Sequence, residues 1–416
     1  MLEFDDIILG AGASGLSLAY HMAQAGLERR VLIVERAPKL ENDRTWSFWE
    51  ATPGVFEPVV SQRWDHIWVH GDGFSKRYSI SPYVYKMIRG IDFYEFMFEW
   101  LKRQANITLV YGELTSLEDH ANGVRVRVNG ETYTGKWAFN SVPASSPPVG
   151  NNFLIQHFKG WIIETQQPVF DPLAATFMDF RVQQANDTRF VYVLPQSPTR
   201  ALVEYTIFSN AMLPEAEYDA ALRTYIREIL KVSSYQILET EYNMIPMTDA
   251  PFQVHPSAHV TNIGTAGGRT KASTGYTFRR IQQQSALIAS SLAANGHPHY
   301  SSSSFDWYGW MDSVFLNVLS HHRQPGAELF TNFFKRNPVL RVLDFLNESS
   351  SCSADLALMT TMNMPVFIRS ALEIIAADIR NGHRKLKGDP NQSRFDVTNP
   401  KVKSEKEQPE VDRVLL

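Results

Sequence analysis

A glycine-rich turn lies between an apolar run and a helix-forming segment within the first 25 residues of this chain. Residues 6–9 are the apolar run, and residues 10–15 read GAGASG. In this spacing Gly10 permits the tight turn, Gly12 lets the backbone approach a pyrophosphate, and Gly15 lets the helix pack closely on the strand. The phosphates then sit on the free N–H groups at the helix N-terminus. The turn therefore predicts an α/β fold with a dinucleotide bound near the start of the chain.

A second predicted strand, residues 31–35, ends in an acid. Glu35 lies 20 residues past Gly15, where a carboxylate can accept hydrogen bonds from ribose hydroxyls, and Arg36 follows it. We assign Ser14, Glu35 and Arg36 to the nucleotide site together with the glycines of the turn. A motif so near the N-terminus favours FAD over NAD as the main ligand. The alternative is a glycine-rich turn without a ligand.

Composition narrows the class of protein. The chain has 416 residues, of which 44% are hydrophobic, and this allows two or three domains with a large core. A net charge of −4 gives no basic field for nucleic acid, so no such partner is expected. Cys352 is the only cysteine, which excludes a disulfide framework and a cysteine-ligated metal and fits the cytoplasm. No run of about 20 apolar residues is present to span a membrane.

The fold class expected from the predicted elements is α/β, in four parts. A Rossmann-type FAD-binding domain is discontinuous and receives an inserted mixed β-sheet substrate domain. A helical C-terminal region follows, and then a charged tail that we expect to be disordered. The FAD-binding domain covers residues 1–75, 105–160 and 255–300, and the substrate domain covers residues 76–104 and 161–254. The helical region covers residues 301–386, and the tail covers residues 387–416.

The inserted domain is expected to consist mainly of strands that pair in a mixed sheet, followed by a helix over residues 215–230. Residues 92–101 carry an apolar helical stripe, and Asp92 with Glu95 resembles a capping box. The four strands are expected at residues 161–165, 176–181, 190–194 and 201–206.

A second glycine-rich segment follows a predicted strand at residues 260–264 and precedes a helix at residues 279–289. Strand, glycines and helix again give a geometry that favours anions. In flavoproteins such a segment meets the ribityl chain and the isoalloxazine ring, whereas the alternative is a loop without a ligand. The residues assigned to flavin contact are Gly264, Ala266, Gly267, Gly268, Thr274 and Gly275.

Five segments, taken in order and spacing, resemble the lycopene cyclase family over about residues 4–375. They match the bacterial and plant lycopene β-cyclases, which are similar in fold to flavin monooxygenases. Many related flavin hydroxylases carry an Asp where this chain has Thr265, and this departure agrees with the cyclase pattern. The segments are DRTWSFW at residues 43–49, MDFR at 178–181, LVEYT at 202–206, IPMT at 245–248 and GTAGG through STGY at 264–276.

The resemblance implies cyclisation of an acyclic carotenoid end without net oxidation. A proton adds to the terminal double bond, the neighbouring double bond attacks the tertiary cation to close a six-membered ring, and a proton is then lost. The resemblance also implies reduced FAD as cofactor, NAD(P)H as electron source, lycopene as substrate and peripheral contact with the membrane. The site then needs an acid in a dry pocket, a group that stabilises positive charge, and a base.

Glu204 is the first candidate for the acid. It corresponds to the family's functional Glu and lies on a predicted strand of the substrate domain. A carboxyl in an apolar pocket keeps its proton because desolvation disfavours the charged form, which makes it available as a general acid near neutral pH. The alternative is an ion pair of Glu204 with a basic residue on an exposed strand face.

The segment that begins DRTW is too aromatic for an ordinary solvated loop. Trp46, Phe48 and Trp49 can each add about 0.5–2 kcal/mol of cation–π stabilisation, or they can serve only as core. Asp43 and Arg44 can touch the cofactor or form an ion pair. We assign Asp43 and Trp46 to the catalytic site with the acid, and Arg44 to the cofactor site.

Apolar side chains crowd residues 316–346, with Lys335, Arg336 and Arg341 among them. A basic, apolar helix can lie in the membrane interface, and the alternative is that these side chains form core.

Two other functions stay open. A redox flavoenzyme of the same fold, such as a monooxygenase or an isoprenoid reductase, would consume NAD(P)H in proportion to its product. A non-catalytic carotenoid-binding flavoprotein would bind the pigment and leave it unaltered.

Overall fold

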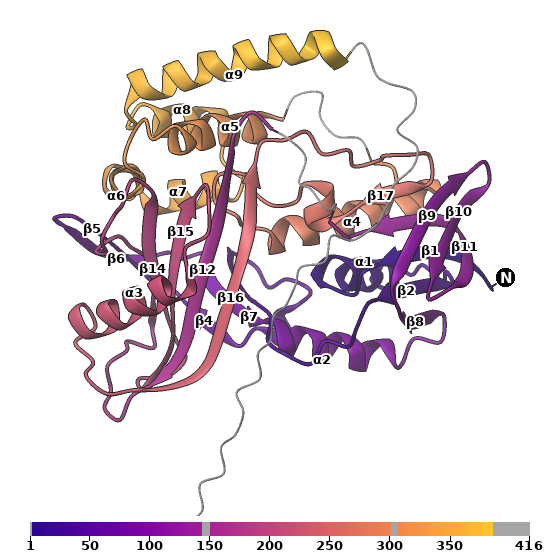
Figure 1. Ribbon diagram of the computed structural model, residues 1–416, viewed down its shortest axis with the longest axis horizontal. Coiled ribbons are helices and arrows are strands. Elements are labelled where there is room, and N and C mark those ends of the chain that lie inside the picture. The colour runs from indigo at the N-terminus through magenta and orange to yellow at the C-terminus, as the bar shows by residue number, and fades with distance from the viewer. Residues whose placement is uncertain (1, 144–149, 301–305, 386–416) are drawn as a thin grey trace, which may run out of the picture.

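The computed structural model describes residues 2–143, 150–300 and 306–385. These residues form two seven-stranded β-sheets, a three-stranded sheet and the helices that cover them (Figure 1). The tail expected at residues 387–416 lies outside the described residues.

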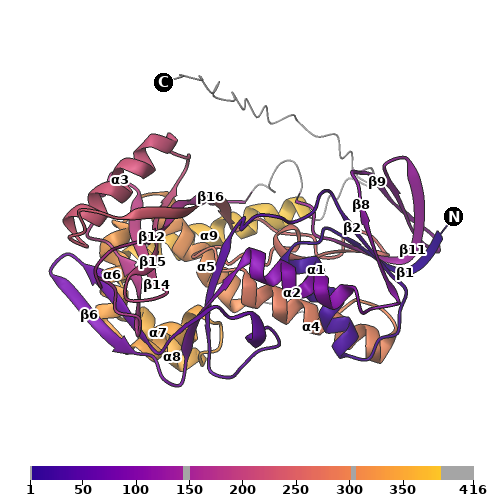
Figure 2. The ribbon, with the colours of Figure 1, turned by 90° about the horizontal axis from the view of Figure 1, so that it is seen from below.

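The first sheet carries the N-terminal turn. β1 lies between β2 and β11 and runs parallel to both, as in a βαβ nucleotide-binding unit. α1 contacts α4, and α2 shares an apolar cluster with both (Figure 2). The Rossmann-type part of the predicted fold is confirmed. Its elements are β1 (Leu2–Leu9), α1 (Ala13–Gln24), β2 (Val31–Glu35), α2 (Gly90–Leu101), β8 (Ile107–Tyr111), β9 (Leu114–His120), β10 (Gly123–Val128), β11 (Glu131–Asn140), β17 (Val260–Asn262) and α4 (Phe278–Asn295), in strand order β8-β2-β1-β11-β10-β9, with β17 paired to β11.

Burial on both faces explains the apolar run of β1. Ile7, Ile8 and Leu9 are at most 1% exposed. Ile8 belongs to the cluster formed with the helices, while Ile7 and Leu9 pack on the other face against β10. A strand covered on both faces reads as a continuous apolar run, as this one does.

The second sheet is mixed, as predicted. β13 runs parallel to β5, and the other neighbouring strands are antiparallel. The sheet also takes in strands that begin at residues 66 and 153, so the domain boundaries stay a proposal. Its strands, in spatial order, are β16 (Gln236–Thr248), β12 (Phe153–Glu164), β15 (Arg200–Ser209), β14 (Thr188–Pro195), β13 (Ala174–Asp179), β5 (His66–Gly71) and β6 (Phe74–Ser79).

The two faces of this sheet have different partners. On β15, Val203 and Tyr205 pack in the cluster covered by α3 (Glu215–Glu228), which we call the outer face. Leu202 and Phe208 pack in the large cluster shared with the C-terminal helices, which we call the inner face. Since side chains alternate along a strand, Glu204 lies on the inner face with Leu202.

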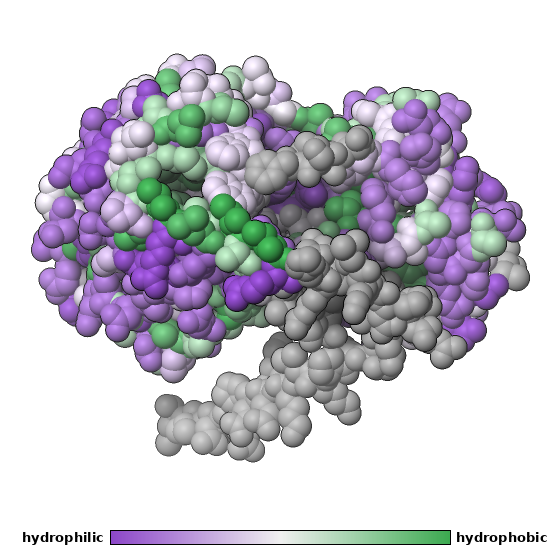
Figure 3. All heavy atoms as spheres, turned by 90° about the horizontal axis from the view of Figure 1, so that it is seen from above, coloured by the Kyte–Doolittle hydropathy of each residue, from purple (hydrophilic) through white to green (hydrophobic). Residues whose placement is uncertain are grey.

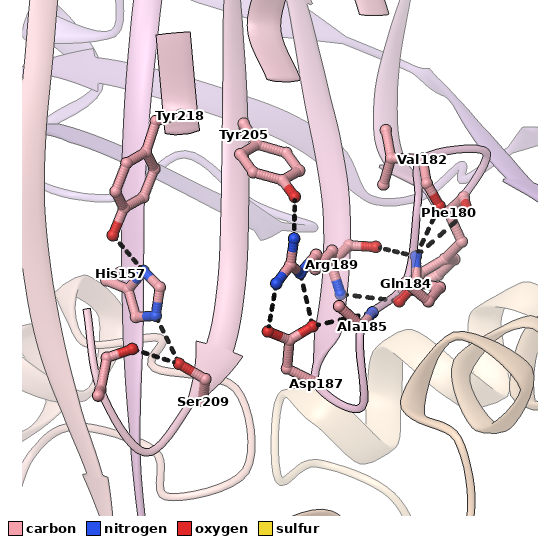
Figure 4. Close-up of polar contacts among 11 residues, drawn as sticks. His157, Phe180, Val182, Gln184, Ala185, Asp187, Arg189, Tyr205, Ser209 and Tyr218 are labelled. Carbon is pink, nitrogen blue, oxygen red and sulfur yellow. Dashed lines mark hydrogen bonds and ion pairs between the residues drawn. The ribbon is translucent and has the colours of Figure 1, made fainter. Parts of the chain in front are cut away.

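Hydrogen bonds tie α3 to the outer face (Figure 4). His157 lies between Ser209 Oγ at 2.7 Å and Tyr218 Oη at 2.6 Å. Burial lowers the pKa of His157 to about 4, so its ring is neutral near pH 7 and has one donor and one acceptor for these two hydroxyls. Beside it, Arg189 pairs with Asp187 at 2.6 Å and points toward Tyr205. The hydrogen bonds of His157 and Arg189 therefore hold the outer face together.

A small sheet connects the two halves. It has the order β3-β7-β4, where β3 is Thr45–Glu50, β7 is Val84–Arg89 and β4 is Gln62–Trp64. The aromatic segment after Asp43 is therefore a strand, and its side chains alternate between two environments.

The helical C-terminal region is confirmed, and of the two alternatives for its apolar side chains the core is the one observed. Leu316, Phe333 and Leu343 are at most 2% exposed and pack in the inner-face cluster, so the apolar side chains of this region form core. A stripe of this spacing suits a core and a membrane equally, and packing decides between them. The helices are α5 (Trp307–Ser320), α6 (Gly326–Arg336), α7 (Val339–Leu346), α8 (Cys352–Met359) and α9 (Met364–Lys385).

The expected capping box of α2 is wrong. The helix begins at Gly90, and Arg89 at the N-cap position makes no side-chain capping bond. Gly90 N–H donates instead to the carbonyl oxygen of Arg44 at 2.8 Å, and a Cβ there would lie 2.8 Å from that oxygen. The contact of Gly90 with Arg44, which lies just before β3, therefore determines where α2 begins.

Candidate active site

The first glycine turn has the shape of an anion cradle. Gly10 has a φ of +100°, and a Cβ on it would lie 2.3 Å from Ser141 Oγ. A Cβ on Gly15 would lie 2.0 Å from the Gly10 carbonyl oxygen. Gly12 differs, because no atom lies within 4 Å of its Cβ position. It caps α1, which has no capping side chain and no acid in its first turn, so the first N–H groups of the helix have no side-chain acceptor from the cap.

The Glu35 carboxylate accepts hydrogen bonds from the backbone of this turn and from its own strand end. Its Oε2 accepts the Ala11 N–H at 2.7 Å, and its Oε1 accepts the Arg36 N–H at 3.0 Å. A carboxylate can accept about four hydrogen bonds, so acceptor sites remain for ribose hydroxyls. The Arg36 side chain is exposed.

The second glycine segment packs directly on the first. Gly264 has a φ of +59°, and a Cβ on it would lie 1.8 Å from Ser14 Oγ. It begins a short 3-10 helix, Gly264–Gly267, which contains Ala266. A Cβ on Gly267 would lie 2.3 Å from the Asn262 carbonyl oxygen, and Gly268 has a φ of +71°. The two predicted cofactor segments, far apart in sequence, therefore meet.

The end of the second segment reaches the other sheet. Gly275 has a φ of +73°, and a Cβ on it would lie 2.0 Å from Gln156 Oε1 of β12. Gln156 Oε1 and Thr274 Oγ1 are both buried without a hydrogen-bond partner among the described residues. Such orphaned atoms fit a polar ligand that runs from the glycine turns toward the second sheet. The open space at Gly12 and these orphaned atoms fit a dinucleotide held by the two glycine segments.

Asp43 and Arg44 lie where the two halves join. Arg44 Nη2 is 3.1 Å from Asp43 Oδ2, and Tyr94 donates to Asp43 Oδ1 at 3.1 Å. Asn243 of β16 donates to the Asp43 carbonyl oxygen at 3.2 Å. The ion pair weighed for these residues is present, and their roles in catalysis or cofactor contact stay predictions.

Glu204 has a second carboxyl beside it, across a glycine. On β12, Gly160 pairs with Glu204 of β15 on one side and with Glu241 of β16 on the other. A Cβ on Gly160 would lie 2.9 Å from Leu202 Cδ1 and 3.2 Å from Glu241 Oε1. The missing side chain leaves the space in which the two carboxyls interact.

Burial dominates the electrostatics of this pair. It raises the pKa of Glu204 well above the ordinary value, and the negative charge of Glu241 and a hydrogen bond to it raise it further. Thr206 Oγ1 donates to Glu204 Oε1 at 3.0 Å. Burial also raises the pKa of Glu241, whose Oε2 accepts a hydrogen bond from Thr45 Oγ1 at 2.8 Å. Glu204 faces no basic partner among its hydrogen bonds, so the ion-pair alternative is not supported in the described part of the chain.

An aromatic cluster, which we call the aromatic enclosure, lies on the Glu204 side of the carboxyl pair. Trp49 meets Tyr276 edge-on at 5.1 Å and Phe177 at 5.7 Å. Tyr192 Oη is 3.5 Å from Tyr276 Oη, and the buried hydroxyl of Tyr85 has no partner among the described residues. Ring faces attract a cation, and this site offers several in a desolvated setting.

A pocket opens beside this enclosure, at the N-terminus of α4. Trp49 and Tyr276 line both the pocket and the aromatic enclosure, and the N-terminal residues of α4 and the end of α7 complete the pocket wall. It lies at the junction of the two halves.

Trp46 points away from the carboxyl pair. It lies on the opposite face of β3 from Thr45, and its ring is 5.4 Å from those of Phe93 and Phe278. Phe48 stacks on Phe278 at 5.0 Å. Both rings belong to the apolar cluster of the first sheet. The catalytic role of Trp46 stays a prediction.

Sequence reasoning missed Gly160 and Glu241. Both lie on strand segments that we did not predict, residues 153–160 and 236–248. Glu241 stands four residues before the IPMT segment, and only strand alternation from that segment could have drawn attention to it.

Within the described ranges, no helix is long and apolar enough to cross a membrane. Those ranges also hold no group of three or more His, Cys, Asp or Glu side chains arranged for a metal ion.

Known proteins resemble this chain along most of its length. The family model described as "Lycopene cyclase protein" matches residues 5–373. A lycopene beta-cyclase of Pantoea ananas is 25% identical over 338 residues, which cover 76% of this chain and 82% of that protein. A geranylgeranyl bacteriochlorophyll reductase-like structure from Thermoplasma acidophilum has a TM-score of 0.59 at 12% identity, covering 89% and 98% of the two chains.

A variant of HpxO from Klebsiella pneumoniae, solved with FAD, has a TM-score of 0.56 at 13% identity, covering 88% of this chain and all of that one. At such identities the structural likeness establishes the fold, which is that of flavin-dependent monooxygenases and reductases.

Proposed function

Because the chain belongs to the lycopene cyclase family, we propose that it is a lycopene β-cyclase, an isomerase that closes the acyclic ends of lycopene into β rings. The observation that carries this proposal is the Glu204–Glu241 carboxyl pair, in which Glu241 is buried and Glu204 is partly buried, beside an aromatic enclosure. A redox enzyme of this fold needs no such acid. The monooxygenase, reductase and non-catalytic alternatives are therefore not favoured.

The residues supply each requirement of the reaction. Glu204 keeps its proton because of burial and can deliver it to the terminal double bond. The faces of Trp49 and Tyr276 stabilise the tertiary cation while the neighbouring double bond closes the ring. The pair then takes a proton back from the ring carbon. One proton enters and one leaves, so no electrons are consumed.

FAD is the proposed cofactor. The turn at Gly12 would hold its pyrophosphate, Glu35 its ribose, and the loop of Thr274 its flavin end. When bound and reduced, the flavin supplies an electron-rich surface beside the cation. NAD(P)H as the reductant follows from the family resemblance and is part of this proposal.

The test measures both the carotenoid product and the amount of NAD(P)H consumed per product. Purified protein with reduced FAD and lycopene in liposomes should yield γ- and β-carotene, while NAD(P)H oxidation stays uncoupled from product. A hydroxylated or reduced acyclic product, with one NAD(P)H consumed per turnover, would support the redox alternative. Unchanged lycopene despite bound FAD would support the binding-protein alternative.

An exposed apolar stripe on α9 supports contact with a membrane. Figure 3 views the molecule onto this helix, and a green band crosses that face. The side chains recur every three or four residues, so they share one face of the helix. They are Met364 (40% exposed), Ile368 (51%), Leu372 (61%), Ile375 (44%) and Ile379 (61%).

We assign a lipid bilayer as the occupant of this stripe, on the cytoplasmic side. The substrate is a hydrocarbon that dissolves only in the bilayer core, so the enzyme must meet it there. Arg369 and Arg380 lie on the same helix and are exposed, which suits anionic headgroups. The opposite side of α9 contacts α5, so the stripe faces outward.

Charge on the stripe should release the protein from membranes. The double variant Leu372→Asp/Ile379→Asp is expected to reduce co-flotation with anionic phospholipid vesicles at least about tenfold, since each buried Leu or Ile side chain is worth roughly 1.5–3 kcal/mol. Leu40→Asp is the matched control, because Leu40 is 80% exposed and lies outside α9. Unchanged flotation of the double variant would refute the assignment, and a shift from dimer to monomer would point to a second copy as the occupant.

A further inference from the structure

The carboxyl pair contains one hydrogen-bond acceptor that lacks a donor. Glu241 is 6% exposed, and its Oε2 accepts from Thr45. Its Oε1 is buried and has no donor among the described residues. That atom lies on the side of Gly160, toward Glu204. A buried carboxylate oxygen without a donor is costly, so something must supply a proton there.

Glu204 is the neighbour that can supply it. Glu204 and Glu241 are the residues paired with Gly160 on its two sides, their side chains lie on the same face, and Glu241 Oε1 lies at the position that a Gly160 side chain would need. Two ionised carboxylates in contact repel, whereas one proton between them gives a hydrogen bond and halves the buried charge. Thr45 favours the charge on Glu241, because its hydroxyl donates to that carboxylate.

We propose that Glu204 and Glu241 hold one proton between them, with Glu204 as the acid and Glu241 as its ionised partner. Glu241 is then a positioning residue that keeps Glu204 protonated. Gly160 is required because any side chain on it would separate the two carboxyls. The use of this proton in cyclisation rests on the proposed function, but the shared proton itself does not.

The pair also closes the proton cycle. Transfer from Glu204 to the terminal carbon breaks one O–H bond and forms one C–H bond, leaving two carboxylates beside the new cation. That doubled negative charge stabilises the cation in a desolvated site. Loss of a proton from the ring carbon to the pair restores the single shared proton. The cycle needs no oxidant, reductant or external base.

The tyrosines near the pair do not titrate near neutral pH. Tyr85, Tyr192 and Tyr276 face Glu204 from β7, β14 and the loop before α4, and burial raises the pKa of each well above its ordinary value. Near Glu241, Glu239 and Arg89 lie 2.8 Å apart as an ion pair. A titration of the pair is therefore separable from its surroundings.

The test follows the Glu204 carboxyl itself. In the FAD-bound protein without lycopene, infrared spectroscopy should show a protonated-carboxyl band near neutral pH that is missing in Glu204→Gln. In Glu241→Gln the pH at which this band disappears should fall by at least about one unit, because a neighbouring negative charge is lost. Glu164→Gln, at the exposed end of β12, should leave it unchanged.

Activity should follow the same shift. Cyclisation requires protonated Glu204, so it is present below that pKa and lost as the pH rises through it. Glu241→Gln should therefore move the alkaline loss of activity to lower pH. Gly160→Ala, which removes no titratable group, should shift the band in the same direction by displacing Glu241.

An unchanged titration in Glu241→Gln, or an ionised Glu204 at neutral pH in the wild-type protein, would overturn the shared proton. The infrared result needs no carotenoid, so it stands apart from the fate of the proposed function. Failure of wild-type protein to cyclise lycopene would refute the function and leave the pair intact.

Discussion

Replacing Glu204 by Gln is expected to reduce cyclisation of lycopene at least about 100-fold, the range for loss of a general acid. The amide has nearly the shape of the protonated carboxyl and can still accept from Thr206 Oγ1. It has no proton to give to a double bond. Product formation in liposomes with reduced FAD measures this directly, and bound FAD, measured by absorbance, should be unchanged.

The same variant should not lose stability at pH 7. Burial raises the folded-state pKa of Glu204, so the stability it contributes is fully present below its unfolded value and is lost as the pH rises through the folded value. Gln does not titrate and avoids that loss. The pH dependence of the midpoint of thermal unfolding should therefore be flatter in Glu204→Gln than in the wild-type protein.

A distant Glu on the same sheet provides the control. Glu164 ends β12 and is exposed, so Glu164→Gln should keep full activity. Full activity in Glu204→Gln would instead move the acid role to the flavin or to another carboxyl. A loss of FAD in that variant would mean that its inactivity reports on the cofactor.

Local sequence was sufficient for the nucleotide turn. Gly10 has a φ of +100°, a Cβ on Gly15 would lie 2.0 Å from the Gly10 carbonyl oxygen, and Glu35 accepts the Ala11 N–H of the same turn. Each of these constraints lies within one βαβ unit. The spacing of the residues alone therefore predicted where the turn, the helix and the second strand would lie.

The partner of Glu204 depended on strand pairing. Glu241 lies 37 residues after Glu204 in sequence, and the two meet only because β12 is inserted between β15 and β16 with Gly160 in register. A glycine inside a strand predicts that another group approaches the strand closely, but it does not identify that group. Register between distant strands is a property of the whole sheet, so the sequence could not predict this pair.

Packing determines which side chains of the aromatic and apolar stripes are buried and which face each of them occupies. Trp46 and Trp49 differ by three positions on β3 and so face opposite sides. The assignment of Trp46 to the catalytic site rested on the composition of the segment, which does not distinguish the two faces of a strand, and it stays a prediction. Similarly, the stripe on α6 is core and that on α9 is exposed, although both have helical spacing.

Replacing Gly12 by Asp is expected to reduce FAD affinity at least about 100-fold, because juxtaposed like charges cost several kcal/mol. The carboxylate would occupy the open space at the α1 N-terminus and place negative charge where the pyrophosphate is proposed to bind. Gly12 has an ordinary φ of −84°, and Asp is a preferred N-cap residue. The FAD-free protein should therefore unfold at the same temperature as wild type, or higher.

Gly12→Asn separates charge from size, since Asn fills the same space and also caps helices. It should bind FAD more weakly than the wild-type protein but clearly more tightly than Gly12→Asp, as measured by flavin fluorescence on titration. Equal loss in the two variants would assign the effect to bulk. Wild-type affinity in Gly12→Asp would show that no phosphate approaches this turn, and the proposed FAD site would then have to be abandoned, because open space at Gly12 is the main reason for placing the pyrophosphate there.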